Sequence, residues 1–256
     1  MAGVGVVVGV LVAGVIVLWP RGTTEVSEQD AVEDFWARDA TSTTVALSSS
    51  SAGPEPGVYT YAAEGEEEVK LGPLPAETRP LPSTVTAVAV DAGAGCFDWT
   101  INLFAEHTED TRWCTQPVLR LDGHTKHQQI GALSPTATMA CDPNEMPDDA
   151  AGSAGSTELS CTLEMTGGPV GISASLVGTA AIGAPTTIDI DGADVAVTPV
   201  SVSYAVSGDL AGTWDETTWW TTEHVPARIE RTLDLSGPAT FSETSKLQLA
   251  TLVPAS

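Results

Sequence analysis

The sequence predicts an all-β protein, an antiparallel curved sheet (a half-barrel or a sandwich) that follows an N-terminal transmembrane helix. From residue 57 onward, apolar and polar residues alternate with a period of two, and Gly-containing turns separate the runs. Strong helix formers in 3.6-residue register are absent from that region. Residues 1–19 carry no charged side chain, whereas the remainder is polar and acidic. We therefore expect an anchor at 1–19, a tether at 20–56 and an extracytoplasmic β domain at 57–256.

The leader is long enough for a membrane anchor, because about 18 apolar residues cross the ~30 Å hydrocarbon core as a helix. A cleaved signal peptide is the alternative, but such peptides have a basic start and an apolar core of roughly 7 to 15 residues. Here no Lys or Arg precedes the run, and its exit, Leu18-Trp19-Pro20-Arg21, is a poor cleavage site. We expect an uncleaved single-pass anchor with the C-terminal domain outside the cell. A true start upstream of Met1 stays open.

Residues 20–56 have the Ser, Thr, Pro and acidic composition of a solvated tether. One interruption lies at residues 27–38, where Ser27 and Asp30 form a weak capping pair. Apolar residues follow at helical spacing: Ala31, Val32, Phe35 and Trp36. This segment is either a short amphipathic helix at the membrane surface or a fluctuating stretch.

The β domain is expected to hold ten or more strands in one unit, and about 200 residues is a normal size for a single sandwich or barrel. The clearest alternating runs are 58–61, 85–90, 97–103, 118–121, 159–163, 170–176 and 200–206. Turn signals separate the strands at Asp122-Gly123, Gly167-Gly168, Asp191-Gly192 and Ser207-Gly208. Residues 142–156 lack periodicity and are predicted to form an exposed loop.

All four cysteines lie in the β domain, which fits an exported chain with a disulfide framework: Cys96, Cys114, Cys141 and Cys161. Three pairings are open. The nearest-neighbour pairing closes two loops of about 20 residues, each contributing ~3 kcal/mol by loop-closure entropy. A zinc site is the alternative, but no CxxC or CxxH spacing is present.

The net charge is −24, from 34 acidic and 10 basic residues. Nucleic acid is excluded as a partner, because its binding needs a basic face that releases counterions. The same charge argues against a domain lying flat on anionic lipid. Solubility of a surface-exposed domain is the simpler explanation of the acidic composition.

The C-terminal part carries a family resemblance. Thr218-Trp219-Trp220 ends a predicted strand, and Pro226-Ala227-Arg228 begins a short return strand. These residues resemble the closing strands of lipoprotein-carrier-like envelope proteins, in which a threonine-aromatic pair precedes a Pro-Val-Arg return; Ala227 departs from the valine. The whole arrangement also resembles uncharacterised single-pass surface proteins of high-GC Gram-positive bacteria. The resemblance implies a curved sheet around an apolar cavity or a long helix, although the domain sequence shows no long helix.

Motifs for metal ions or catalysis are weak. Asp189-x-Asp191-Gly192-x-Asp194 has the oxygen ligands of a calcium loop, but an Asp-Gly hairpin explains it better. The pair His124 and His127 lacks the further ligands of a metal centre, and surface histidines around a turn are expected instead. GxSxG is absent, and Ser245-Lys246 lacks the SxxK spacing. We therefore expect no enzyme, no cofactor and no metal.

Tryptophan is the most suggestive residue type for binding. The candidate ligand-binding residues are Trp99, Trp214, Trp219 and Trp220. Adjacent strand residues point to opposite faces, so one residue of the Trp219-Trp220 pair can meet a ligand while the other packs. Core or edge packing is the alternative for all of them. The expected function is binding of an apolar or lipid-like ligand by a membrane-tethered domain. The second hypothesis is a structural or adhesive surface module without a ligand cavity, whose partner is another protein.

Overall fold

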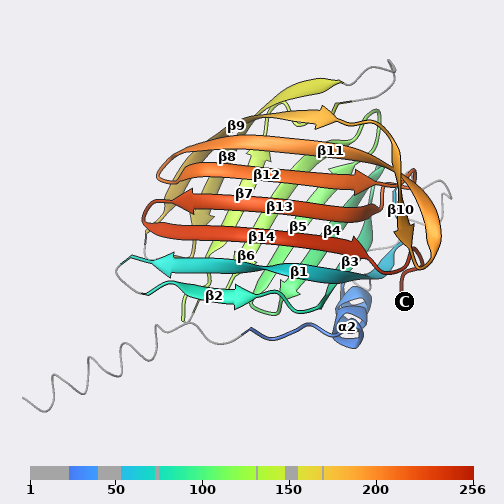
Figure 1. Cartoon of the computed structure of the whole chain (residues 1–256). Helices are drawn as coiled ribbons and strands as arrows, with labels where there is room; N and C mark the ends of the chain where they lie inside the picture. The colour runs from blue at the N-terminus through green and yellow to red at the C-terminus, as the bar shows by residue number, and fades with distance from the viewer. Residues whose placement is uncertain (1–22, 40–52, 73–74, 131, 148–154, 169) are drawn as a thin grey trace, which may run out of the picture.

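The computed structural model describes residues 23–39, 53–72, 75–130, 132–147, 155–168 and 170–256 (Figure 1). One helix and fourteen strands lie within these ranges. In chain order they are α2 (Glu28–Asp39), β1 (Gly57–Leu71), β2 (Glu77–Pro80), β3 (Thr84–Gly93), β4 (Cys96–Phe104), β5 (His107–Cys114), β6 (Arg120–Gln128), β7 (Thr136–Cys141), β8 (Ser156–Thr166), β9 (Ile172–Ile182), β10 (Thr186–Ile190), β11 (Ala193–Gly208), β12 (Ala211–Trp220), β13 (Pro226–Ser236) and β14 (Ala239–Leu249). The all-β prediction is confirmed.

The sheet closes into an antiparallel barrel of twelve strands, which corrects the prediction of a half-barrel or sandwich. The order around the ring is β11-β12-β13-β14-β1-β3-β4-β5-β6-β7-β8-β9, and β9 pairs back onto β11. The closing seam is tight at Gly178, where an added Cβ would lie 2.0 Å from the carbonyl oxygen of Ser203 on β11. Only glycine allows that approach, so this residue belongs to the closure.

The barrel is flattened, so its two walls pack against each other. In Figure 1, β11–β14 and β1 form the near wall, and the strands from β3 onward cross behind it at an angle. One apolar cluster joins inward side chains of both walls, among them Tyr61, Trp99, Leu176 and Leu233. This layered core resembles that of a sandwich, although the described strands form a closed hydrogen-bonded ring to which β2 and β10 are appended.

Of the two alternatives for residues 27–38, the structure has the helix: α2 is formed, and it packs on the outside of the barrel. Ser27 and Asp30 form the predicted capping pair, with the Asp30 N–H donating to Ser27 Oγ at 3.2 Å. Ala31 and Phe35 are buried against Val58 of β1 and Val88 of β3. The barrel thus covers Ala31 and Phe35 of α2, whereas Trp36 stays 52% exposed.

The predicted anchor, residues 1–19, lies outside the described residues. Among those that are described, no helix is long and apolar enough to cross a membrane.

The two disulfides are Cys96–Cys114 and Cys141–Cys161, the nearest-neighbour pairing. Each joins neighbouring strands, β4 to β5 and β7 to β8.

Two local predictions are wrong. Asp122-Gly123 is no turn but lies within β6, where Gly123 pairs with Arg112 and Leu121 with Trp113, so that Asp122 is the extra residue of a bulge. His124 is therefore a strand residue and is buried, with 8% of its surface exposed, whereas His127 is largely exposed as expected.

The Asp191-Gly192 turn is confirmed, since both residues have positive φ (52° and 77°) and join β10 to β11.

Candidate functional site

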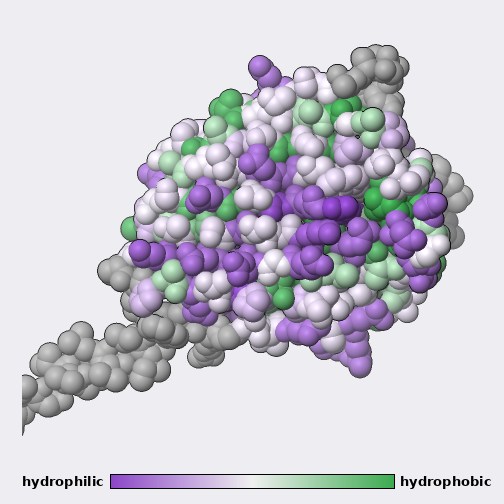
Figure 2. Space-filling model, viewed as in Figure 1, coloured by the Kyte–Doolittle hydropathy of each residue, from purple (hydrophilic) through white to green (hydrophobic). Residues whose placement is uncertain are grey.

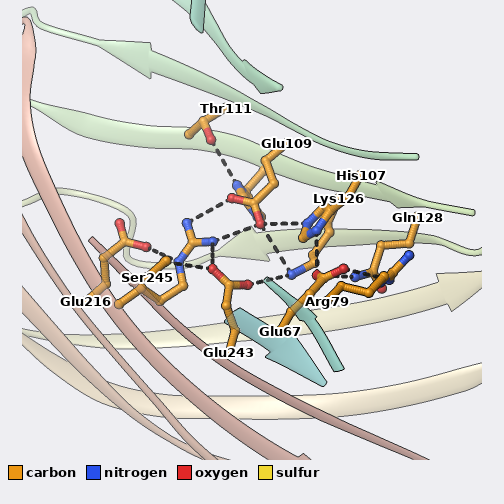
Figure 3. Close-up of polar contacts among 12 residues, drawn as sticks. Glu67, Arg79, His107, Glu109, Thr111, Lys126, Gln128, Glu216, Glu243 and Ser245 are labelled. Atoms are coloured by element: carbon orange, nitrogen blue, oxygen red, sulfur yellow. Dashed lines mark hydrogen bonds and ion pairs between the residues drawn. The ribbon is translucent and has the colours of Figure 1, made fainter. Parts of the chain in front are cut away.

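A chain of buried ion pairs runs between the two walls, and sequence reasoning missed it. We call it the charge network. Its members are Glu67 (β1), Arg79 (β2), His107 and Glu109 (β5), Lys126 (β6), Glu216 (β12), Arg231 (β13) and Glu243 (β14) (Figure 3). The members on ring strands occupy positions that face the interior, because side chains alternate between the two faces of a strand, and Arg79 joins them from the appended strand β2.

Arg231 is the hub at one end of the network. Its Nη2 lies 2.8 Å from Glu109 Oε2, its Nη1 3.2 Å from Glu243 Oε1, and its Nε 2.8 Å from Glu216 Oε2. Three carboxylates thus share one guanidinium, whose five N–H donors in a fixed fork suit such a role. Because Glu109 belongs to the far wall and Glu216 and Glu243 to the near wall, Arg231 fastens the walls together.

Lys126 and His107 extend the network toward Glu67. Lys126 Nζ lies 3.1 Å from Glu243 Oε2 and 3.3 Å from Glu109 Oε1. His107 contacts a carboxylate through each ring nitrogen, Nδ1 at 2.8 Å from Glu67 and Nε2 at 3.2 Å from Glu109. At the far end Arg79 Nη2 lies 2.6 Å from Glu67 Oε1.

The network is electrically balanced when His107 is protonated, since four carboxylates then face four cations. Burial and Lys126 disfavour the charged imidazole, but Glu67 and Glu109 outweigh them and raise the pKa of His107 above its usual value. Burial likewise opposes ionised carboxylates, yet Lys126 and Arg231 lower the pKa of Glu243 to about 2 and hold that of Glu109 well below its usual range. The interior therefore contains fixed charges that compensate one another.

Ion pairing fits this donor set better than a metal ion does. Ligand atoms of Glu67, His107 and Glu243 lie within 4.8 Å of one another. The same atoms, however, already contact Arg79, Lys126 and Arg231, and both nitrogens of His107 face carboxylates. A cation would have to displace these partners, so we assign the network a structural role.

An open cleft lies at one end of the barrel, and we call it the mouth cleft. Its volume is about 490 Å³. Its lining comes from several segments: residues 115–119 after β5, Pro147, the end of β9 with Pro185, residues 196–200 of β11, and residues 220–224 at the end of β12 and in the turn that follows. The lining side chains are mainly apolar, including Val118, Leu119, Ile182, Val197, Val200 and Trp220. In Figure 2 hydrophobic side chains gather at the end of the barrel where β10 and β11 lie, whereas hydrophilic ones prevail on the near wall.

Trp220 separates the mouth cleft from a smaller cavity inside the barrel. It is 6% exposed and packs edge-on against Trp113, with ring centroids 5.1 Å apart. Its side chain lines both the mouth cleft and an interior cavity of about 70 Å³. A second interior cavity, of about 50 Å³, lies on the other side of Trp214 and Arg231.

The structure distributes the four predicted ligand-binding tryptophans over different environments. Trp99 is 2% exposed and packs against Tyr59, with ring centroids 5.0 Å apart. Trp214 is half-buried inside the barrel beside the Arg231 guanidinium, which lies 5.6 Å from its ring centroid. Trp219 is half-buried beneath Arg228, 4.8 Å from its ring centroid. Of the four, only Trp220 lines the mouth cleft.

Comparisons with protein-family models, with curated proteins and with solved structures found no match to this chain. The geometry of the barrel and its mouth is therefore the ground for a functional assignment.

Proposed function

We propose that this chain is a non-catalytic, extracytoplasmic binding protein that holds a small apolar or lipid-like ligand in the mouth cleft. The observation that carries the proposal is the cleft itself: about 490 Å³, with a mainly apolar lining that includes Trp220 and with three threonines, Thr198, Thr221 and Thr222, among its polar residues. Ligand pockets commonly measure ~300–1,000 Å³, are mostly apolar with a few polar groups, and occur in the mouths of β-barrels.

The mouth is a better place for such a ligand than the space between the walls. The two interior cavities measure about 70 and 50 Å³. Cavities of that size accommodate a few water molecules and not an acyl chain, given that a single water needs ~10–15 Å³ on this measure. The charge network further disfavours apolar groups between the walls, because they would separate its ion pairs.

Two disulfides support placement of the domain in an oxidising compartment outside the cytoplasm. Anchoring to the cell membrane through residues 1–19 is part of the same proposal. An anchored protein with its mouth open to solvent is suited to take up molecules of low solubility near the membrane.

Native mass spectrometry of the full-length chain, purified from membranes, tests the proposal. The wild type is expected to carry an additional mass that organic extraction identifies as an apolar or lipid-like molecule. Val118→Arg places a cation in the mouth cleft and is expected to lose that mass, because an unpaired charge disfavours an apolar ligand.

The matched control is Val177→Arg, which adds the same charge at a valine that is 60% exposed on β9 and outside the mouth cleft. This variant is expected to keep the ligand. Absence of any ligand from the wild type after reconstitution with membrane lipid extract, or equal loss in both variants, contradicts the proposal.

A second candidate function, a protein-interaction module, is favoured by β10. Among the described strands this five-residue strand pairs with β11 alone, so its other edge offers backbone hydrogen-bonding groups to an added strand. Capture of a protein partner that is lost on Ile188→Pro but kept in Val118→Arg supports this candidate over the first.

A further inference from the structure

The hairpin that β10 forms with β11 carries carboxylates at directly opposed positions. β10 lies beside β11 at the right-hand end of the barrel in Figure 1. Asp189 of β10 is the cross-strand partner of Asp194 of β11, and both side chains are exposed. Asp191 lies in the turn that joins the two strands. Like charges directly opposite each other destabilise a strand pair, so the fold of the hairpin itself gains nothing from this arrangement.

The described chain supplies no cation to these carboxylates. Asp189 accepts a hydrogen bond from the Gly192 N–H at 3.3 Å, but no ion pair joins any of the three aspartates to a residue that the structure describes. The deficit extends well beyond the hairpin. No Lys or Arg stands between Lys126 and Arg228, so strands β7 to β12 contain carboxylates and neither of these cations. A partner with cations of its own would complete this part of the surface.

A strand added to the outer edge of β10 would meet two chemically different faces. On one face Ile188 is half-buried and Ile190 is buried, and both pack on the core of the barrel. On the other face Thr187 and Asp189 are exposed. Side chains of an added strand alternate between these faces, so every second residue would lie beside the isoleucines and the others beside the aspartate.

We propose that the outer edge of β10 binds an extended segment of another protein in which apolar residues alternate with Lys or Arg. The proposal rests on the second candidate function, strand addition at β10, and names the chemistry of its partner. Charged side chains on a sheet edge deter strands of like charge and of low polarity, but they admit a strand of opposite charge. A second copy of this chain fits poorly, because it brings the same carboxylates to the interface.

Binding of synthetic peptides to the full-length chain, followed by fluorescence anisotropy, tests the proposal. The probe is a labelled peptide of alternating valine and lysine, about as long as β10. We expect it to bind, and to bind several-fold more weakly when NaCl is raised from about 50 to about 300 mM, because salt screens exposed charges. An alternating valine–glutamate peptide should not bind. A peptide of the same composition with paired valines and paired lysines should bind at least fivefold more weakly, because its charges have the wrong period.

N-methylated peptides show whether the backbone of the probe pairs with β10. A strand directs alternate N–H groups to its two edges, so methylation of every second nitrogen blocks one edge and leaves the other intact. Two versions of the valine–lysine peptide are compared, with the methyl groups on the valines or on the lysines. We expect one version to lose binding and the other to keep it. Adhesion through charge alone would treat the two versions alike.

Neutral variants of the chain locate the peptide. Asp189→Asn combined with Asp194→Asn keeps the side-chain shapes and removes two charges, and it is expected to weaken binding about 5- to 10-fold. The matched control combines Glu66→Gln with Asp234→Asn, which removes two exposed charges from β1 and β13. Its affinity should stay within twofold of the wild type.

Equal weakening in the two double variants, or equal loss with the two N-methylated peptides, overturns the proposal. Equally tight binding of the valine–glutamate peptide overturns the basic chemistry of the partner but leaves strand addition standing. Failure of the folded wild type to bind any of the peptides overturns both. The aspartate variant should still carry the apolar ligand in native mass spectrometry, because Asp189 and Asp194 lie outside the mouth cleft.

Discussion

At the scale of single residues, the molecule depends on charges that are buried and mutually compensated. Taking ions out of water costs several kcal/mol each, and only close partners offset that cost. Arg231 has three such partners, and its loss leaves Glu243 beside Lys126 and leaves Glu109 beside Lys126 and His107. Contacts of exposed ions, by contrast, contribute little.

Arg231→Leu is therefore expected to reduce the free energy of unfolding by about 3–5 kcal/mol. The matched control is Arg112→Leu, which breaks the exposed pair of Arg112 with Asp98 and should cost only about 0–1 kcal/mol. Urea denaturation monitored by tryptophan fluorescence measures both values. Similar losses in the two variants would show that the network does not hold the walls together.

The stability of the protein should depend on pH through His107 on the alkaline side. The pKa of His107 is raised in the folded state, so its contribution is fully present below the unfolded value near 6.5 and is lost as pH rises through the folded value. We expect the melting temperature of the wild type to fall as pH rises above the unfolded value near 6.5, and that of His107→Gln to fall less over the same pH range. A wild-type melting temperature that is flat across this range and unaffected by the substitution would contradict the assignment.

On the acid side, the dependence of stability on pH has the opposite sign. The pKa values of Glu67, Glu109 and Glu243 are lowered, so their contribution is present above the unfolded value of 4.5 and is lost as pH falls through the folded values. For Glu243 that value is about 2. Acid unfolding of the wild type should therefore extend below pH 4. In Glu243→Gln the free energy of unfolding should be lost over a narrower pH interval, because this carboxyl group no longer titrates. Unfolding complete at pH 5 would contradict it.

At the scale of strands, the closing seam between β9 and β11 distinguishes a barrel from an open sheet. Gly178→Ala should destabilise the protein by about 1–3 kcal/mol, because its Cβ meets a backbone oxygen that cannot move freely. Gly123→Ala is the control, since a Cβ there has nothing within 4 Å. Hydrogen exchange is expected to accelerate at β9 and β11 in the first variant only. Unchanged protection of the seam in Gly178→Ala would show that closure does not need the glycine.

The strands that were best predicted from the sequence are those with a polar outer face and an apolar inner face. The runs in β8, β9 and β11 have this alternation, and they were found. The second half of β1 and all of β5 were missed, because their inward positions carry Glu67, His107 and Glu109 and so alternation in hydrophobicity disappears. The sequence did carry a signal for the charge network, namely charged residues at every second position, as in His107-x-Glu109. The partners of these residues, however, lie on strands that are distant in the sequence.

The same reasoning explains which parts of the candidate site were predictable. Trp220 was among the tryptophans named from the sequence, because tryptophan is a rare residue and other tryptophans lie close to it along the chain. The mouth cleft was not predicted, because segments far apart in the chain form it. His124 was misplaced because an Asp-Gly pair signals a turn, while pairing with β5 and β7 holds it within a strand.

At the scale of the whole molecule, nearly all of the net charge of −24 lies outside the balanced charge network. A surface of like charge repels itself and destabilises the compact state, and salt screens this repulsion. Raising NaCl from 20 to about 500 mM, at which the Debye length falls to a few ångströms, should increase the melting temperature. A decrease would indicate that exposed ion pairs outweigh the repulsion.

The location of the bound ligand decides the central claim most directly. A fatty acid that carries a photoreactive diazirine, cross-linked to the full-length chain and mapped by peptide mass spectrometry, reports which residues it contacts. The account predicts labels at Val118, Ile182, Val197 and Trp220 of the mouth cleft, abolished by an excess of unmodified fatty acid. Labels that lie between the walls of the barrel, or that spread evenly over its outer surface, would contradict it.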